Sequence, residues 1–474
     1  MFINGQWIQT KATFAVINPA TGNTIARVAD GGIEETRLAI AAAENAYSSW
    51  SATTAYERSA YLYRAHQIML QEKQALAEMM TMEQGKPLKA ATTEVQYGAD
   101  FLLWFAEEAK RIYGETIPSS RSNQRFLVQR QPVGIVGAIT PWNYPVSMIT
   151  RKIAPALAAG CTVILKPAEA TPLCAIALFK IFEKAGIPTG VVNLVTAADP
   201  VPVGHELCTN QSIRKITFTG STRVGRLLAT EAAPQLKRVS MELGGHAPFI
   251  VFADANPVHA AKGAALVKFL NTGQACICPN RIYVHRRILT PFLETLSERI
   301  TAMQAGNGLK KGITIGPLVN QTALDKVANQ VEDARAKGAE LLVGGRRILK
   351  QGLENGFFYA PTLLSEVTPE MLIYREETFG PAAAVIPFDD NDDIIGMAND
   401  TDYGLAAYIY TNDINRAIRT FEQLKFGMVG INDINPTSAA APFGGIKQSG
   451  LGREGARAGL EEYLDTKLAG IALS

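Results

Sequence analysis

The chain of 474 residues lacks the features that mark secreted, membrane and nucleic-acid-binding proteins. Five cysteines cannot form a complete disulfide framework, and 46 basic against 44 acidic residues give no broad basic field for nucleic acid. The N-terminus has no basic start followed by an apolar run, and no stretch reaches the roughly 18 apolar residues of a membrane span. We therefore expect a cytoplasmic protein with neither a membrane nor a nucleic-acid partner.

Two common kinds of catalytic centre are also missing. The five histidines are scattered, there is no His-Glu-x-x-His, and the spacing Cys276-Ile-Cys278 has no second cysteine pair to complete a zinc site. There is no Gly-x-Ser-x-Gly nucleophile elbow either. The sequence therefore predicts no metal and gives no support to serine hydrolase chemistry.

The composition is that of a large globular protein. Hydrophobic residues make up 47% of the chain and charged residues 19%, which excludes a disordered chain. The length corresponds to roughly two to four domains at about 100–200 residues each. No internal repeat or low-complexity tract interrupts the chain.

The first third of the chain has a helical pattern. Glu34–Trp50, Ala55–Met82 and Pro87–Ile112 carry Ala, Leu, Glu and Met at helical spacing, and Pro87 is placed to start the third helix. Phe126–Gln131 then alternates apolar and polar residues, which predicts an exposed strand or arm outside the core. The tail, Glu461–Leu473, is predicted to be a last strand with no obvious hairpin partner.

From Val133 onward, short strands alternate with helices. This order predicts a parallel, doubly wound sheet with helices on both faces. A second run of strands follows Gly244-Gly245, where we place a boundary. The predicted strands are Gly134–Thr140, Thr162–Lys166, Val191–Val195 and Ile213–Thr219, then Pro248–Phe252, Arg281–Val284 and Ala382–Phe388; the helices between them include Pro172–Ala185 and Arg223–Ala233.

Two glycine-rich segments compete as phosphate sites. Gly450–Gly455 has the spacing Gly-x-Gly-x-x-Gly, but it follows a polar loop and not the buried strand that a dinucleotide fingerprint requires. Gly220–Gly225 follows an apolar strand and opens a helix, so its free amides and the helix dipole point at an anion. The alternative for the second segment is an ordinary strand-to-helix turn with Ser221 as N-cap.

Two residues are candidates for covalent and acid–base chemistry. Cys276 lies between Gly273 and Pro279 in an irregular loop, where a thiol can be reached; a buried, inert cysteine is the alternative. Glu242 follows apolar residues at a strand end, where a raised pKa suits a general base; a solvated glutamate is the alternative.

Nine motifs in one order make the whole chain resemble the aldehyde dehydrogenase superfamily. They are Asn18-Pro-Ala-Thr-Gly22, Glu83-Gln-Gly-Lys-Pro87, Thr140-Pro-Trp-Asn-Tyr-Pro145, Lys166-Pro-Ala-Glu169, Phe218-Thr-Gly-Ser221, Met241-Glu-Leu-Gly-Gly245, Gly273-Gln-Ala-Cys276, Glu376-Glu-Thr-Phe-Gly-Pro381 and Pro442-Phe-Gly-Gly445. Further segments are most similar to the succinate-semialdehyde dehydrogenases: Ile149-Thr-Arg-Lys152, Cys276-Ile-Cys278, Gly316-Pro-Leu318 and Ser449–Gly455.

The resemblance implies a Rossmann-type cofactor domain, an α/β catalytic domain and a β oligomerisation flap. The implied boundaries are 1–117 with 138–244 for the cofactor domain, 118–137 with 455–474 for the flap, 245–430 for the catalytic domain, and 431–454 for a loop region that returns to the active site. The family also implies a homodimer or homotetramer.

The resemblance further implies the reaction and the residues that perform it. Cys276 would attack an aldehyde, with Asn143 and the Cys276 amide holding the oxyanion; hydride would pass to the nicotinamide, and Glu242 would activate water to hydrolyse the thioester. The implied cofactor-binding residues are Trp142, Lys166, Glu169, Gly220, Ser221, Gly225, Leu243, Glu377 and Phe379. Because Glu169 suits the free ribose hydroxyls, we expect NAD to be preferred, with NADP as an alternative.

The implied substrate is succinate semialdehyde, oxidised to succinate. Arg151 matches one arginine of that family, with Thr437 and Ser438 as hydroxyl donors, but Leu270 stands where a second arginine is expected, and Lys268 lies two residues away. The alternatives are another small aldehyde (glycolaldehyde, lactaldehyde, glutarate or 2-oxoglutarate semialdehyde) or a non-catalytic NAD-binding protein. Cys278 is a candidate redox partner of Cys276.

Overall fold

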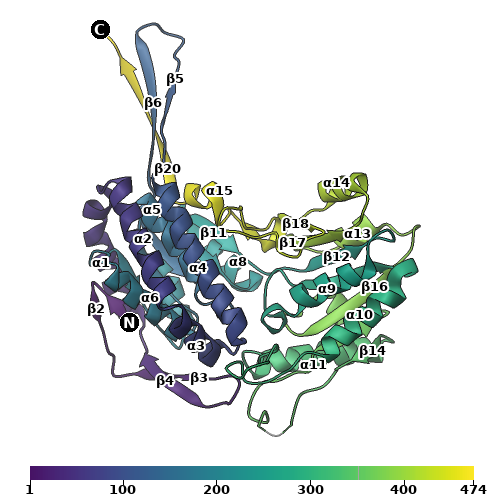
Figure 1. The fold of residues 1–474 in the computed structure, drawn as a ribbon. Helices are drawn as coiled ribbons and strands as arrows, with labels where there is room; N and C mark the ends of the chain where they lie inside the picture. Colours follow the sequence, from purple (N-terminus) through teal and green to yellow (C-terminus); the bar gives the residue numbers. More distant parts are fainter. Residues whose placement is uncertain (351) are drawn as a thin grey trace.

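Two mainly parallel β-sheets with helices packed against them form the frame of the molecule (Figure 1). The computed structural model describes residues 1–350 and 352–474. The predicted α/β class is confirmed. The strands are buried because helices cover the sheets, which is why they appear in the sequence as short, continuous apolar runs.

The first sheet has eight strands. Its five central strands are parallel, while β19 at one edge and β1 and β2 at the other pair antiparallel. In spatial order the strands are β19 (Gly450–Leu451), β11 (Arg238–Glu242), β10 (Ile213–Thr219), β7 (Ile135–Ile139), β8 (Thr162–Lys166), β9 (Val192–Leu194), β1 (Phe2–Ile3) and β2 (Gln6–Trp7).

The helices that belong with this sheet are mostly where the sequence predicts them. Ala55–Met82 is the exception: it is two helices, because Glu72 leaves helical geometry within the polar run Gln71–Gln74, which has no apolar face to bury. The helices are α1 (Ile33–Ser51), α2 (Ala55–Gln71), α3 (Lys73–Gln84), α4 (Leu88–Ala109), α5 (Ser147–Ala159), α6 (Pro172–Lys184), α7 (Pro200–Thr209), α8 (Thr222–Ala232) and α15 (Ala456–Glu461).

The second sheet has seven strands, and only β14 is antiparallel to its neighbour. In spatial order they are β14 (Glu340–Val343), β15 (Thr362–Ser365), β16 (Ala382–Phe388), β13 (Pro279–His285), β12 (Ala247–Val251), β17 (Ala406–Tyr410) and β18 (Met428–Ile431). Its helices are α9 (Pro257–Lys268), α10 (Leu289–Thr301), α11 (Gln321–Ala336), α12 (Leu372–Arg375), α13 (Ile394–Asn399) and α14 (Ile414–Gln423).

A three-stranded arm projects from the body of the molecule, as Figure 1 shows. It is formed by β5 (Glu115–Ile117), β6 (Gln124–Pro132) and β20 (Leu464–Ala472). The C-terminal strand, for which the sequence offered no hairpin partner, pairs antiparallel with β6 along its whole length. The two segments that lacked a place in the core are therefore each other's partners. A separate hairpin joins β3 (Thr13–Ile17) and β4 (Thr24–Ala29).

The chain reverses direction across the first sheet between β7 and β10. From β7 it passes to β8 and β9 on one side and then returns to β10 and β11 on the other. Ligands of open α/β sheets bind at such a point, beyond the carboxyl ends of the strands. No helix in residues 1–350 and 352–474 has both the length and the apolar character that a membrane crossing demands.

Candidate active site

The catalytic candidates lie where the two sheets approach each other. Glu242 is the last residue of β11, and residues 243–246 lead directly into β12 of the second sheet. Cys276 lies in the turn between the short 3-10 helix η2 (Leu270–Gly273) and β13. The carboxyl edge of the first sheet therefore presents Glu242, and the amino edge of the second presents Cys276.

The loop that carries Cys276 is held in an unusual backbone conformation. Asn271, Thr272 and Gly273 all have positive φ, at 48°, 60° and 76°. A Cβ on Gly273 would lie 2.1 Å from the carbonyl oxygen of Gly380, so only glycine fits there. Such left-handed residues cost free energy and persist where the surroundings over-determine them.

Gly245 fixes the other side of the nucleophile. A Cβ on this residue would lie 2.2 Å from the backbone carbonyl oxygen of Cys276, and its amide donates to Glu377 Oε1 at 3.0 Å. The glycine thus lets the strand connection lie directly against the nucleophile loop. The predicted residues Cys276, Glu242 and Glu377 are brought into one region by this contact.

Asn143 is joined to the same loop. Its Nδ2 donates to the carbonyl of Gln274 at 3.0 Å, and its own carbonyl accepts from Asn271 Nδ2 at 3.0 Å and from Lys86 Nζ at 2.7 Å. The second hydrogen of the Asn143 amide remains available to an oxyanion. Lys86 in turn forms a buried ion pair with Glu94, and the sequence analysis assigned neither residue a role.

The Cys276 thiol is protonated at rest. Burial raises its pKa well above the usual value, and the nearby Glu242 carboxylate adds to the rise, while Arg151 opposes it. The residue is half-buried and lines a cavity, so an electrophile can reach it. Formation of the nucleophilic thiolate therefore requires a group that removes the proton.

Glu242 is suited to proton transfer near neutral pH. Burial raises the pKa of its carboxyl to about 8, and repulsion from Glu454 adds to the rise. Within residues 1–350 and 352–474, Glu242 Oε1 is buried without a hydrogen-bond partner. An unsatisfied buried oxygen is costly unless it serves another molecule, such as an attacking water.

A buried charge cluster that the sequence analysis missed lies next to these groups. Glu454 forms an ion pair with Arg151, whose Nη2 lies 2.8 Å from Glu454 Oε2, and a second ion pair with Lys152. Burial raises the pKa of Glu454, but the two cations outweigh it and lower the pKa below its usual value. Glu454 belongs to the Gly450–Gly455 segment, whose short strand β19 pairs antiparallel at the sheet edge, so the rejection of a dinucleotide fingerprint there holds.

The residues predicted to bind a pyrophosphate lie at the reversal point of the first sheet. Ser221 caps α8, accepting from the Val224 amide at 3.4 Å, so the N-cap alternative is also correct. A Cβ on Gly225 would lie 2.3 Å from the side chain of Leu243, so this glycine lets α8 approach the strand connection. Helix α8 begins two residues after Gly220 and has no acidic residue in its first turn. An anion fits this arrangement.

The remaining cofactor candidates lie at or after the ends of β7 and β8, and in the segment before β16. Lys166 ends β8, and its Nζ lies 3.1 Å from Glu169 Oε2; burial lowers the pKa of Lys166, and Glu169 opposes that change. On the nucleophile side, the rings of Trp142 and Phe379 pack edge to face with centroids 5.6 Å apart. Phe379, two residues after Glu377, has a positive φ of 52°, an uncommon backbone conformation for a residue other than glycine.

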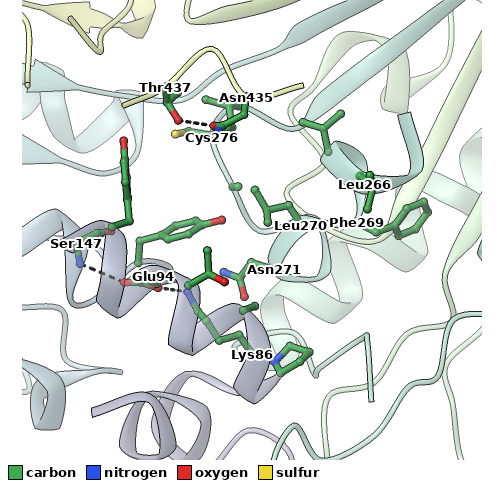
Figure 2. Close-up of a pocket in the computed structure, with 18 of the residues that line it drawn as sticks. Lys86, Glu94, Ser147, Leu266, Phe269, Leu270, Asn271, Cys276, Asn435 and Thr437 are labelled. Atoms are coloured by element: carbon green, nitrogen blue, oxygen red, sulfur yellow. Dashed lines mark hydrogen bonds and ion pairs between the residues drawn. The ribbon is translucent and has the colours of Figure 1, made fainter. Parts of the chain in front are cut away.

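A cavity of about 530 Å³ opens onto Cys276 (Figure 2). Arg151, Thr437 and Leu270 line it, whereas Ser438 is exposed and its Oγ accepts from the Ala440 amide at 3.1 Å. Lys268 does not line the cavity: it is fully buried, and burial lowers the pKa of its ammonium to about 8. Lys268 therefore does not replace the missing arginine.

Cys278 is turned away from the cavity. Its thiol is buried and donates to the carbonyl of Val267, with Sγ and oxygen 3.1 Å apart. Burial raises its pKa to about 11, so the group is a neutral thiol.

Among residues 1–350 and 352–474, no group of three or more His, Cys, Asp or Glu is placed to hold a metal ion.

Comparison with known proteins places this geometry in a family. The chain is 51% identical over 454 residues to a probable succinate-semialdehyde dehydrogenase [NADP(+)] of Sinorhizobium fredii, covering 96% of this chain and 92% of that protein. It is 49% identical to the glutarate-semialdehyde dehydrogenase of Pseudomonas putida, covering 100% and 97%. The crystal structure of an aldehyde dehydrogenase from Brucella melitensis biovar abortus 2308 matches with a TM-score of 0.97 at 49% identity, covering 100% and 97%. Since the aldehyde dehydrogenase family model also matches residues 7–469, the chain belongs to the aldehyde dehydrogenase family.

Proposed function

We propose that this enzyme oxidises succinate semialdehyde to succinate with a nicotinamide dinucleotide as hydride acceptor. The observation that carries the proposal is that one cavity presents both the Cys276 thiol and the Arg151–Thr437 pair. A small aldehyde with a carboxylate at its far end can then place its carbonyl at the sulfur and its charge at the arginine. The names of the Sinorhizobium and Pseudomonas relatives, both semialdehyde dehydrogenases, support the same substrate class.

In the first half of the reaction Cys276 forms the bond to carbon. Transfer of the thiol proton to a water molecule gives a thiolate, which attacks the aldehyde carbon and converts its oxygen into an oxyanion. The free Asn143 amide hydrogen and the Cys276 backbone N–H would hold that oxyanion, and each such donor is typically worth about 3–4 kcal/mol. A bound nicotinamide would supply the hydride acceptor for this carbon, and the acyl group would stay on the Cys276 sulfur as a thioester.

In the second half Glu242 would act as general base. The carboxylate removes a proton from water, the hydroxide attacks the thioester carbon, and the Cys276 sulfur leaves as thiolate. The partnerless Oε1 and the raised pKa of Glu242 suit this step. Chemistry at pH 7–8 then uses the fraction of Glu242 that is ionised.

The proposed cofactor residues come from both sheets: Lys166 ends β8, Gly220 and Ser221 follow β10, and Glu377 precedes β16. Lys166 and Glu169 would hold the adenosine ribose, the α8 end with Gly220 and Ser221 the pyrophosphate, and Glu377 the nicotinamide ribose. We retain NAD as the proposed preference because of the carboxylate of Glu169. That preference is not confirmed, since the Sinorhizobium relative's name specifies NADP(+).

The arm formed by β5, β6 and β20 is proposed as the oligomerisation element. Leu127, Leu468 and Ile471 are large hydrophobic residues exposed on it, and a projecting sheet of this kind has little to bury against within one chain. Light scattering coupled to gel filtration tests the expected dimer or tetramer. A monomer at micromolar concentration would contradict it.

The decisive test is reduction of NAD and NADP, followed at 340 nm, with succinate semialdehyde and a panel of other aldehydes. We expect turnover that Cys276→Ala abolishes. The assay also separates an enzyme from a non-catalytic NAD-binding protein. If glycolaldehyde, lactaldehyde or an uncharged aldehyde is preferred by about tenfold in kcat/KM, about 1.4 kcal/mol, the substrate assignment is wrong while the reaction class stands.

A further inference from the structure

The cavity in front of Cys276 has two unlike walls. One wall is formed by the first three turns of α4 and the turn before it, and contributes Lys86, Lys89, Thr93 and Tyr97. The facing wall comes from the end of α9 and from η2 and is apolar, with Leu266, Phe269 and Leu270; Figure 2 shows these three on the side opposite Lys86 and Glu94. A ligand with an apolar chain and a charged end matches such a pair of walls.

Three cations line this cavity, and two of them are already paired. Lys86 is paired with Glu94, and Arg151 with Glu454. Lys89 is exposed, and no ion pair joins it to any side chain within the part of the chain that the structure describes. Its ammonium is therefore the cavity charge that a ligand can bind without breaking an internal ion pair.

Lys89 lies apart from the Arg151 side of the cavity. Lys89 lies in the first turn of α4, and Tyr97, near Arg151 and Thr437, lies eight residues later, about 12 Å along the helix axis at ~1.5 Å per residue. Both side chains line the same cavity. A carboxylate at Lys89 thus lies farther along α4 than one held by Arg151 and Thr437.

The Lys89 end of the cavity is also built to favour an anion. Pro87 precedes α4, and no acidic residue lies in the first turn, so the helix dipole there is uncompensated. Ser147 also lines the cavity, and its buried hydroxyl has no hydrogen-bond partner within residues 1–350 and 352–474, so it can donate to an anion. A buried hydroxyl without a partner is costly unless it serves another molecule.

We propose that Lys89 is a specificity-determining residue, which binds the terminal carboxylate of ω-carboxy aldehydes longer than succinate semialdehyde. The inference rests on the proposed function, because it places the aldehyde of the same substrate class at Cys276. The apolar wall of Leu266, Phe269 and Leu270 covers the additional methylene groups. The family resemblance leads one to expect an arginine at position 270. In this proposal Leu270 instead contacts the methylene chain of the longer aldehyde.

The test is a matched series of aldehydes. Wild type, Lys89→Gln and Lys89→Arg are assayed with the four-, five- and six-carbon ω-carboxy aldehydes and with butanal, pentanal and hexanal. Lys180→Gln, which removes an exposed charge on α6 outside the cavity, is the control for net charge. Lys89→Gln is expected to raise the KM of the six-carbon acid about three- to fivefold, as suits an exposed ion pair, with kcat unchanged.

Further readouts separate this role from a structural one. The increase in KM caused by Lys89→Gln should be small for succinate semialdehyde and absent for hexanal. Lys89→Arg should keep the wild-type KM, and high salt, which screens an exposed charge, should reduce the difference between wild type and Lys89→Gln. An equal rise for the acid and for hexanal, an equal rise for all three acids, or no rise overturns the proposal. The order of kcat/KM values among the aldehydes in the wild type tests the proposed function separately. The Lys89 proposal is tested by the ratio of KM in Lys89→Gln to KM in the wild type, which is measured for each aldehyde that the wild type oxidises.

Discussion

The Glu454 carboxylate lies 2.8 Å from the guanidinium of Arg151, so the arginine at the cavity wall is already paired within the protein. Both side chains are buried, and the ring of Phe443 lies 3.9 Å from Arg151 Cζ. A substrate carboxylate therefore meets a cation whose charge is shared with Glu454. Lys152, which also pairs with Glu454, supplies the second positive charge of the cluster.

Arg151→Ala is expected to raise the KM for succinate semialdehyde about tenfold, with a much smaller effect on butanal. The reason is the loss of one charge-assisted contact, roughly 1.5 kcal/mol. The variant also leaves Glu454 with one cation, which destabilises a buried charge. Steady-state kinetics and thermal unfolding of Arg151→Ala and of the double variant with Glu454→Gln separate the two effects. Equal changes in KM for both aldehydes would remove Arg151 from carboxylate binding.

Glu242→Gln is expected to release about one equivalent of NADH per active site and then stall. Acylation of Cys276 does not need the base that activates water, whereas hydrolysis of the thioester does. Stopped-flow absorbance at 340 nm measures the burst and the slow phase after it. Unimpaired steady turnover would contradict the role of Glu242.

The pH profile of turnover should follow the same carboxyl group. Since burial raises the pKa of Glu242 to about 8, the ionised base increases as pH rises through that value, and thioester hydrolysis should increase with it. At lower pH the neutral acid predominates and hydrolysis slows. The slow phase of Glu242→Gln should lack this rise, and an identical rise in both enzymes would assign the titration to another group.

Gly245→Ala is expected to lower kcat at least a hundredfold while the protein still folds. The added Cβ would lie 2.2 Å from the backbone oxygen of Cys276, and neither backbone can yield without moving the nucleophile. A displacement of about 1 Å can cost a hundredfold in rate. Gly204→Ala is the matched control, since its Cβ on α7 meets only Leu228 at 3.6 Å. Near-normal kcat in Gly245→Ala would show that the loop is mobile.

The sequence predicted the parts of the fold that depend on local pattern. Short, mainly apolar runs such as Thr162–Lys166 and Ala247–Val251 are strands buried on both faces, so they show no alternation of polar and apolar residues. The helix break at Glu72 was not predicted. A short polar segment can lie on the exposed side of one continuous helix or separate two helices, and the sequence pattern is the same in both cases. The pairing of β6 with β20 spans most of the chain, so no local pattern could show it.

The candidate site divides in the same way. Cys276, Glu242 and Gly225 stand in motifs with local signals, whereas the role of Glu454 depends on contacts with Arg151 and Lys152, about 300 positions earlier. The only signal was its place in Gly450–Gly455, which resembles a motif of another kind. Ion pairs between residues so far apart in the sequence result from tertiary packing, so no sequence spacing predicts them.

Peroxide is expected to inactivate the enzyme in a way that dithiothreitol reverses, and Cys278→Ala should lose that reversibility. A disulfide with Cys276 is the proposed cause. Because the Cys278 thiol donates to Val267 and burial raises its pKa to about 11, the bond requires rotation of this side chain and an activated Cys276. Mass spectrometry of the alkylated protein identifies the product. Unchanged reversible inactivation in Cys278→Ala would exclude Cys278 as the partner.

Glu169→Gln is expected to shift the cofactor preference toward NADP by about ten- to a hundredfold in the ratio of kcat/KM values. The carboxylate of Glu169 would accept hydrogen bonds from the ribose hydroxyls of NAD, and the same charge would repel a 2′-phosphate. Glu169 is half exposed and pairs with Lys166 at 3.1 Å, so the measured ratio depends on whether the carboxylate stays at the ribose or turns to solvent. Glutamine keeps the size of the side chain while removing its charge, so kcat/KM for NADP should rise and that for NAD should fall only modestly. A wild type that already uses NADP as well as NAD, with no change in Glu169→Gln, would show that the carboxylate does not read the ribose.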